Sequence, residues 1–113
     1  MAEGSDEVIP AAVVADSKIA GYLLNPHHPE GGPKARYFIA CGFRPDEPGS
    51  FIEALLEHGE AGNLVRVTHG EFGIKYICEG PLQAPRGATR PIRSVWQKKP
   101  DDVWRFLVNA YPF

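Results

Sequence analysis

The chain has 113 residues, a formal net charge of −2 and a hydrophobic fraction of 43%. A chain of this length is expected to form one domain around a single core. No apolar run approaches the roughly 18 residues of a membrane span, and the two cysteines lie in apolar surroundings without a disulfide framework. No secretory signal pattern opens the chain, so we expect a reduced, cytoplasmic protein.

Charge divides unevenly along the chain. Residues 1–61 hold four Lys/Arg and ten Asp/Glu, whereas residues 62–113 hold eight Lys/Arg and four Asp/Glu. Because the second half also has the pattern of β-strands, the sequence predicts a basic sheet that can hold an anion such as a nucleic-acid phosphate. The acidic first half would repel RNA unless it faces away from that sheet.

The first half predicts helices. Residues 1–10 are short, polar and acidic and are predicted to be flexible, with one α+β domain over residues 11–113. Helices are predicted over residues 16–25, 33–42 and 50–59. Asp16 is the N-cap candidate of the first helix, a proline opens the second, and a capping box at residues 50–53 opens the third.

After residue 62 apolar and polar side chains alternate, which is the period of β-strands. The predicted strands cover residues 64–68, 75–79, 92–96 and 103–110. Short turns join them, so neighbouring strands must be antiparallel. The predicted fold is therefore α+β, with three N-terminal helices packed on one face of a four-stranded antiparallel β-meander.

Alternation also assigns side chains to the two faces of this sheet. In the last strand the row predicted to face the helices is Trp104, Phe106, Val108 and Ala110. The polar side chains predicted to share the open face are Lys75, Glu79, Arg93, Arg105 and Tyr111. A slip of one residue in strand register would scatter this group.

An ordered set of motifs resembles an uncharacterised bacterial domain family. Its opening part is Tyr22-Leu23-Leu24-Asn25-Pro26, His28-Pro29, Gly31-Gly32 and Lys34-Ala35. The later parts are Phe38, Gly42-Phe43, Gly73-x-Lys75-Tyr76, Gly80-Pro81-Leu82, Pro85-x-Gly87, Val95-Trp96 and Arg105-Phe106-x-x-x-Ala110-Tyr111-Pro112. Together they cover about residues 16–112, and the set is more specific than any one piece.

This resemblance implies a class of function. Relatives occur as C-terminal modules of secreted polymorphic toxins and as stand-alone proteins encoded beside a second small protein. The order of helices and then strands also resembles the barnase/EndoU/colicin/RelE superfold of metal-independent RNases, which is an analogy of fold. The expected function is a toxin-like or toxin-derived RNase domain that cleaves RNA through attack by the 2′-hydroxyl, with a small cognate partner protein.

Cleavage of this kind needs a base, an acid and cations beside the developing phosphorane charge. The predicted catalytic residues are His28, Glu79 and Arg105. The predicted substrate-binding residues are Lys34, Lys75, Arg93 and Tyr111. The family pattern has Thr where this chain has Asn109, so any substrate contact through that hydroxyl would be absent here.

Each of these residues also has a structural interpretation. His28 could hold its Gly-rich loop by hydrogen bonds, and the basic strand residues could form a solvated face with Glu79 as a cross-strand partner. The alternative function is a non-catalytic protein-binding module whose basic sheet meets an acidic partner. A structural protein without a ligand is the third hypothesis.

No cofactor, metal or membrane is predicted. The adjacent side chains of His27 and His28 diverge, and no further ligands complete a tetrahedral metal site. Residues 31–34 superficially match a phosphate loop but lack its spacing.

Overall fold

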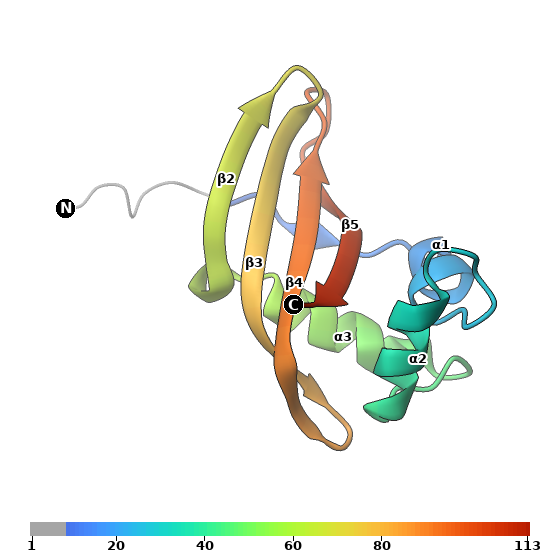
Figure 1. Cartoon of the computed structure of the whole chain (residues 1–113). Helices are drawn as coiled ribbons and strands as arrows, with labels where there is room; N and C mark the ends of the chain where they lie inside the picture. Colours follow the sequence, from blue (N-terminus) through green and yellow to red (C-terminus); the bar gives the residue numbers. More distant parts are fainter. Residues whose placement is uncertain (1–8) are drawn as a thin grey trace.

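The computed structural model describes residues 9–113, so the flexibility predicted for residues 1–10 falls almost wholly outside the described residues. Helical segments lie first in the chain and the long strands follow, with one short strand ahead of the helices (Figure 1). The predicted α+β class and the order of helices before the meander agree with this arrangement.

Prolines position two of the three α-helices in residues 9–113. The helical bounds are Asp16–Lys18 for α1, which continues into a π-helical turn η2 at Ile19–Leu23, Gly32–Ala40 for α2, Pro48–His58 for α3 and Ala61–Asn63 for the 3₁₀ turn η3. Proline suits the first turn of a helix, where its missing N–H would have no partner. The capping box predicted at residues 50–53 is wrong, because α3 already begins at Pro48 and has no side-chain cap.

Within the described residues the sheet has five strands and is mixed. The strand bounds are Ala12–Val13 for β1, Leu64–Gly70 for β2, Gly73–Ala84 for β3, Gly87–Lys98 for β4 and Arg105–Pro112 for β5. Their order is β1-β5-β4-β3-β2, with β1 parallel to β5 and every other pair antiparallel. The prediction of a four-stranded antiparallel sheet is wrong, because the chain ahead of α1 adds a parallel edge strand to β5.

The core lies between the helices and one face of the sheet. In Figure 1 the strands β3 and β4 pass in front of α3. Phe38 and Phe51 of the helices and Trp96 of the sheet are fully buried members of one apolar cluster. As predicted, the side chains of β3 and β4 that face the helices are Tyr76, Cys78, Ile92, Ser94 and Trp96. The opposite face, called the open face below, carries Lys75, Glu79 and Arg93.

A β-bulge interrupts β5. Val95 of β4 pairs with Asn109, but the next residue of β4, Trp96, pairs with Leu107. Strand β5 therefore holds one extra residue, Val108, opposite this step. An extra residue in one strand inverts the alternation of side chains on either side of it.

The inversion explains why the face assignment of β5 fails ahead of Ala110. Ala110 faces the helices as predicted, but Leu107 and Arg105, three and five residues before it, are buried as well. Trp104 and Phe106 are exposed instead. The predictions that Trp104 lies in the core and that Arg105 lies on the open face are both wrong.

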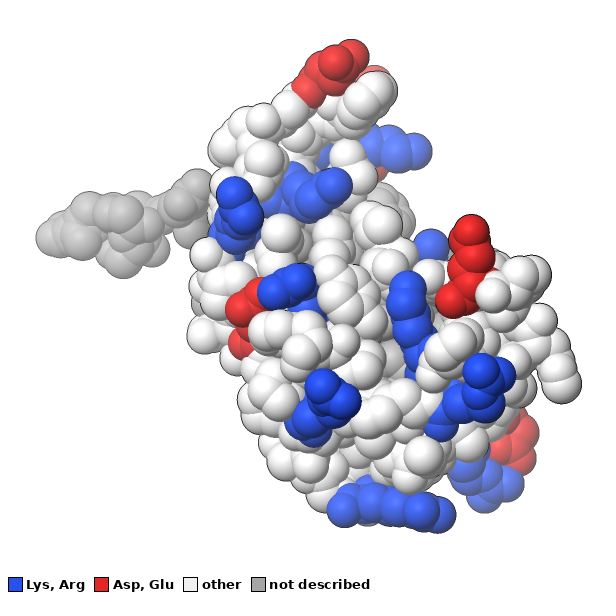
Figure 2. All heavy atoms as spheres, viewed as in Figure 1, with Lys and Arg blue, Asp and Glu red and all other residues white. Residues whose placement is uncertain are grey.

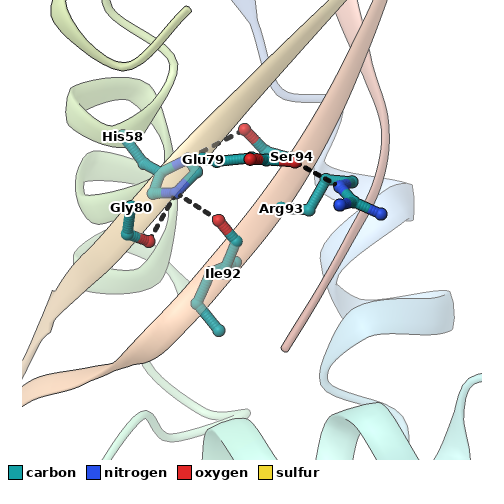
Figure 3. Close-up of polar contacts among 6 residues, drawn as sticks. All are labelled: His58, Glu79, Gly80, Ile92, Arg93 and Ser94. Carbon is teal, nitrogen blue, oxygen red and sulfur yellow. Dashed lines mark hydrogen bonds and ion pairs between the residues drawn. The ribbon is translucent and has the colours of Figure 1, made fainter. Parts of the chain in front are cut away.

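His58 joins the end of α3 to the sheet through buried hydrogen bonds. Its Nε2 lies 3.0 Å from the carbonyl oxygen of Gly80 and 2.9 Å from that of Ile92 (Figure 3). Because only an N–H can satisfy carbonyls, the ring proton lies on Nε2, and Nδ1 accepts from the Ser94 hydroxyl at 2.8 Å. Trp96 Nε1 donates to the same hydroxyl. Burial lowers the pKa of His58 from its ordinary value near 6.5.

We expect the free energy of unfolding to fall as the pH drops below about 6.5. The folded His58 ring stays neutral there while the unfolded ring takes up a proton, so unfolding is favoured at lower pH. Urea unfolding between about pH 5 and pH 8 measures this. His58→Gln should flatten the dependence and lower the stability at neutral pH by about 1–3 kcal/mol, because buried partners lose their bonds. The exposed His69→Gln should retain it, and an unchanged slope in His58→Gln would contradict the assignment.

The turn between β2 and β3 requires glycine at residue 73. Gly73 has φ +117°, and a Cβ there would collide with the carbonyl oxygen of Lys98. We expect Gly73→Ala to lower the free energy of unfolding by more than about 1 kcal/mol. Gly70→Ala, where a Cβ meets open space, is the matched control and should change it by less than about 0.5 kcal/mol. Equal effects of the two substitutions in urea unfolding would contradict this account of the turn.

Candidate functional site

Three side chains from neighbouring strands form a row across the open face. Glu79 of β3 lies opposite Arg93 of β4, which lies opposite Tyr111 of β5. Arg93 Nε donates to Glu79 Oε2 at 2.7 Å, and both side chains remain about one third exposed (Figure 3). The guanidinium also lies over the rings of Tyr111, at 5.9 Å, and Phe113, at 4.4 Å. Glu79 therefore neutralises Arg93, which is the cross-strand pairing expected of a sheet surface.

Lys34 brings a second cation to this row from the helical layer. Its Nζ donates to the Tyr22 hydroxyl at 2.8 Å and to Asn109 Oδ1 at 3.3 Å. The same atom lies 5.2 Å from the centroid of the Tyr22 ring and 5.5 Å from that of Tyr111. In the part of the chain that the structure describes, no carboxylate lies within 4 Å of it. Dipoles and ring faces alone hold this half-buried ammonium, so its positive charge is not compensated.

The Gly-Gly pair ahead of α2 allows this arrangement. A Cβ on Gly31 would come within 2.6 Å of the Tyr22 ring, and one on Gly32 within 2.7 Å of the Pro26 carbonyl oxygen. The absence of a side chain at Gly31 thus lets Tyr22 pack against the start of α2, whose first turn carries Lys34, and the absence at Gly32 lets the Pro26 carbonyl approach. The local sequence explains why Tyr22 and Lys34 meet although they are 12 residues apart.

His28 holds the loop beneath Tyr22. Its Nδ1 accepts from the backbone N–H groups of Glu30, at 3.1 Å, and Gly31, at 2.9 Å. The ring also meets the edge of the Tyr22 ring, with centroids 4.8 Å apart. Because Nδ1 uses its lone pair in these bonds, the proton of the neutral ring lies on Nε2. These contacts are those of the loop-holding interpretation.

Two other predicted residues lie away from this row. Lys75 is on the same face, but it is four residues from Glu79 along β3, which is about 13 Å. Arg105 lies beneath the helices on the opposite face and is 5% exposed. The structure therefore brings together Lys34, Glu79, Arg93 and Tyr111, with His28 behind Tyr22, and leaves Lys75 and Arg105 outside.

Arg105 has structural partners instead. Its Nε donates to the Pro10 carbonyl at 2.7 Å and its Nη2 to the Gly59 carbonyl at 2.6 Å. The guanidinium lies over the Trp96 ring at 5.2 Å and the Tyr76 ring at 5.8 Å. Burial lowers the pKa of Arg105, since the charged form loses solvation. Arg105 thus links the start of the described chain to the end of α3.

The row borders a shallow hollow of about 380 Å³. Its lining residues are Val65, Arg66, Ile77, Glu79, Arg93 and Tyr111. Sequence reasoning missed Arg66 and Tyr22 as members of this surface, and it considered Asn109 only as a replacement for the family's Thr. Alternation in β2 could have indicated Arg66, and Tyr22 lies within the first motif, but nothing local pointed to the contact of Asn109 with Lys34.

The described residues contain no group of three or more His, Cys, Asp or Glu side chains that could hold a metal ion. None of their helices is long and apolar enough to cross a membrane. What the geometry offers is a cationic, aromatic site for an anion on the open face of an α+β domain.

The chain belongs to the DUF6883 family, a domain of unknown function, which matches residues 6–113. Its fold is similar to that of a chain in a contact-dependent growth inhibition toxin–immunity protein complex from Klebsiella pneumoniae 342, with a TM-score of 0.70 and 18% identity. That match covers 88% of this chain and 92% of the other, and at this identity it shows a shared fold alone. No curated protein matches the sequence.

Proposed function

We propose that this chain is a toxin-like, metal-independent RNase domain that acts on RNA in the cytoplasm. The observation that carries the proposal is the half-buried Lys34 ammonium, which lies between two tyrosine rings. It forms no ion pair with any carboxylate of the described residues. Such a cation attracts an anion, and ring faces beside it suit nucleic-acid bases. The shared fold with a chain of a toxin–immunity complex supports the toxin class.

The reaction assigns a role to each group in the row. The RNA 2′-oxygen attacks the adjacent phosphorus, which forms a cyclic phosphate and releases the 5′-oxygen. Glu79 accepts the 2′-hydroxyl proton through the carboxylate oxygen that does not bind Arg93. Lys34 and Arg93 stabilise the charge on the phosphorane oxygens.

Tyr22 supplies the proton for the leaving oxygen. Lys34 donates to the Tyr22 oxygen, so the hydroxyl hydrogen remains free to pass to the 5′-oxygen. The resulting phenolate lies beside the ammonium, and water carries the proton from the protonated Glu79 back to it, which restores both groups. His28 acts as a positioning residue that holds Tyr22, and Tyr111 offers a stacking surface for a base.

We expect the protein to cut total RNA in the presence of a chelator and to leave cyclic-phosphate or 3′-phosphate ends. Lys34→Met should lower the rate by about 100-fold or more, because it removes the uncompensated charge from the reacting phosphate. Gel analysis with end labelling measures both results. Lys99→Met, an exposed position beyond β4, is the matched control and should cut at the full rate. A wild-type protein that is inactive after denaturing purification and refolding would contradict the proposal.

The second candidate function is a non-catalytic module that binds a small partner protein encoded by a neighbouring gene. Large apolar side chains exposed on or beside the open face favour it, namely Val65, Phe72, Phe106 and Val108. Exposed apolar groups ringed by charge are typical of protein-binding surfaces. The similar fold likewise comes from a complex of two proteins.

A partner that binds the open face should lose affinity when Arg93 changes sign. We expect Arg93→Glu to weaken binding of the co-expressed partner by at least about 10-fold, because it places a like charge beside Glu79 and an acidic surface. Isothermal titration calorimetry measures this. The exposed Arg86→Glu, in the turn between β3 and β4, removes the same charge away from the row and should have little effect. Equal affinities of the two variants would contradict docking at this face.

A further inference from the structure

The open face carries a longer feature than the row at Arg93. The hollow beside the row shares Arg66 and Ile77 with a second hollow of about 330 Å³, so the two adjoin each other. The second hollow runs along β3 to Lys75 and to Phe72 in the turn between β2 and β3. We call the surface formed by Arg93, Arg66, Ile77, Lys75 and Phe72 the open-face track.

Positive charge dominates this track. In the residues 9–113 that the structure describes, Glu79 is the one carboxylate that lines either hollow, and it is paired with Arg93. Arg66 and Lys75 are exposed, and neither forms an ion pair with a described carboxylate. Figure 2 shows basic side chains spread across the face seen in Figure 1, with fewer acidic ones. Two cations beyond the row therefore remain uncompensated.

Flat or apolar surface separates these cations. Ile77 is half-buried between Arg66 and Lys75, and Phe72 at the far end is 73% exposed. A single nucleic-acid strand fits this alternation, because it offers phosphates to cations and unstacked bases to apolar and aromatic side chains. A duplex fits it poorly, since its bases are stacked and paired inside.

The track is longer than the space that one nucleotide bound at the row would occupy. Lys75 lies about 13 Å along β3 from Glu79, and Phe72 lies beyond Lys75 in the turn. A strand whose reacting phosphate sits between Lys34 and Arg93 would thus have further nucleotides over Arg66 and Lys75.

We propose that the open-face track binds several nucleotides of single-stranded RNA on one side of the cleaved bond. Arg66 and Lys75 pair with phosphates, and Phe72 stacks on a base. This inference rests on the proposed RNase function for cleavage, but the binding itself is measured separately from it.

The kinetic test compares a dinucleotide with a single-stranded 12-mer that contains the same cleavable step. Wild-type protein should show a kcat/KM at least about 10-fold higher for the 12-mer, since each stacked base adds affinity. Lys75→Ala, Arg66→Ala and Phe72→Ala should each move this ratio towards one. Arg86→Ala is the matched control and should leave the ratio at the wild-type value. Equal kcat/KM for both substrates in an active wild-type protein would overturn the track and leave the proposed function standing.

The binding test uses fluorescence anisotropy of a labelled 12-mer whose 2′-hydroxyls at the cleavable step are replaced by hydrogen. The single strand should bind at least about 10-fold more tightly than the same strand in a duplex. Lys75→Ala should reduce the slope of log K against log salt by about 0.7, as expected for one lost phosphate contact. Tight binding without cleavage of the unmodified 12-mer would overturn the RNase function but support the track. Equal affinities for the single strand and the duplex would overturn the track. A protein that binds a partner at this face but binds no RNA would overturn it as well.

Discussion

One extra residue in β5 decides which side chains reach the candidate site. The bulge at Val108 leaves Tyr111 on the open face beside Arg93, while it turns Arg105 towards the helices. Without it, Arg105 would lie in the same row as Tyr111 on the open face and the carbonyls of Pro10 and Gly59 would lose their donor. The core and the site therefore depend on the same irregularity.

Between α3 and the sheet, the buried side chains of His58 and Arg105 are accommodated in opposite ways. His58 stays neutral and satisfies both ring nitrogens, whereas Arg105 keeps its charge and relies on two carbonyls and two aromatic rings. This difference matters for the charge of the open face. Of the eight cations in residues 62–113, Arg105 is buried and Arg93 is neutralised by Glu79. The basic surface is therefore weaker than the composition indicates.

Local signals predicted much of the fold and less of the site. Alternation predicted the faces of β3 and β4, and prolines and glycines predicted where α2 begins and ends. Strand β1 was missed because two residues carry too little periodicity. The bulge was missed because a valine at position 108 is an ordinary strand residue and gives no sign of it. Lys34 could be suspected from its motif, but its contact with Asn109 joins residues 75 positions apart and appears only in the folded chain.

The two cations over the Tyr111 ring differ in what an approaching anion would gain. Arg93 already has Glu79 as a partner, so a phosphate there must compete with a carboxylate at 2.7 Å. Lys34 has only a hydroxyl, an amide oxygen and ring faces, and a phosphate would supply the missing negative charge. Because Lys34 reaches this face from the first turn of α2, the acidic half of the chain adds a cation to the sheet surface. Under the proposed function, this cation reduces the repulsion expected between that half and RNA at the site of the reacting phosphate.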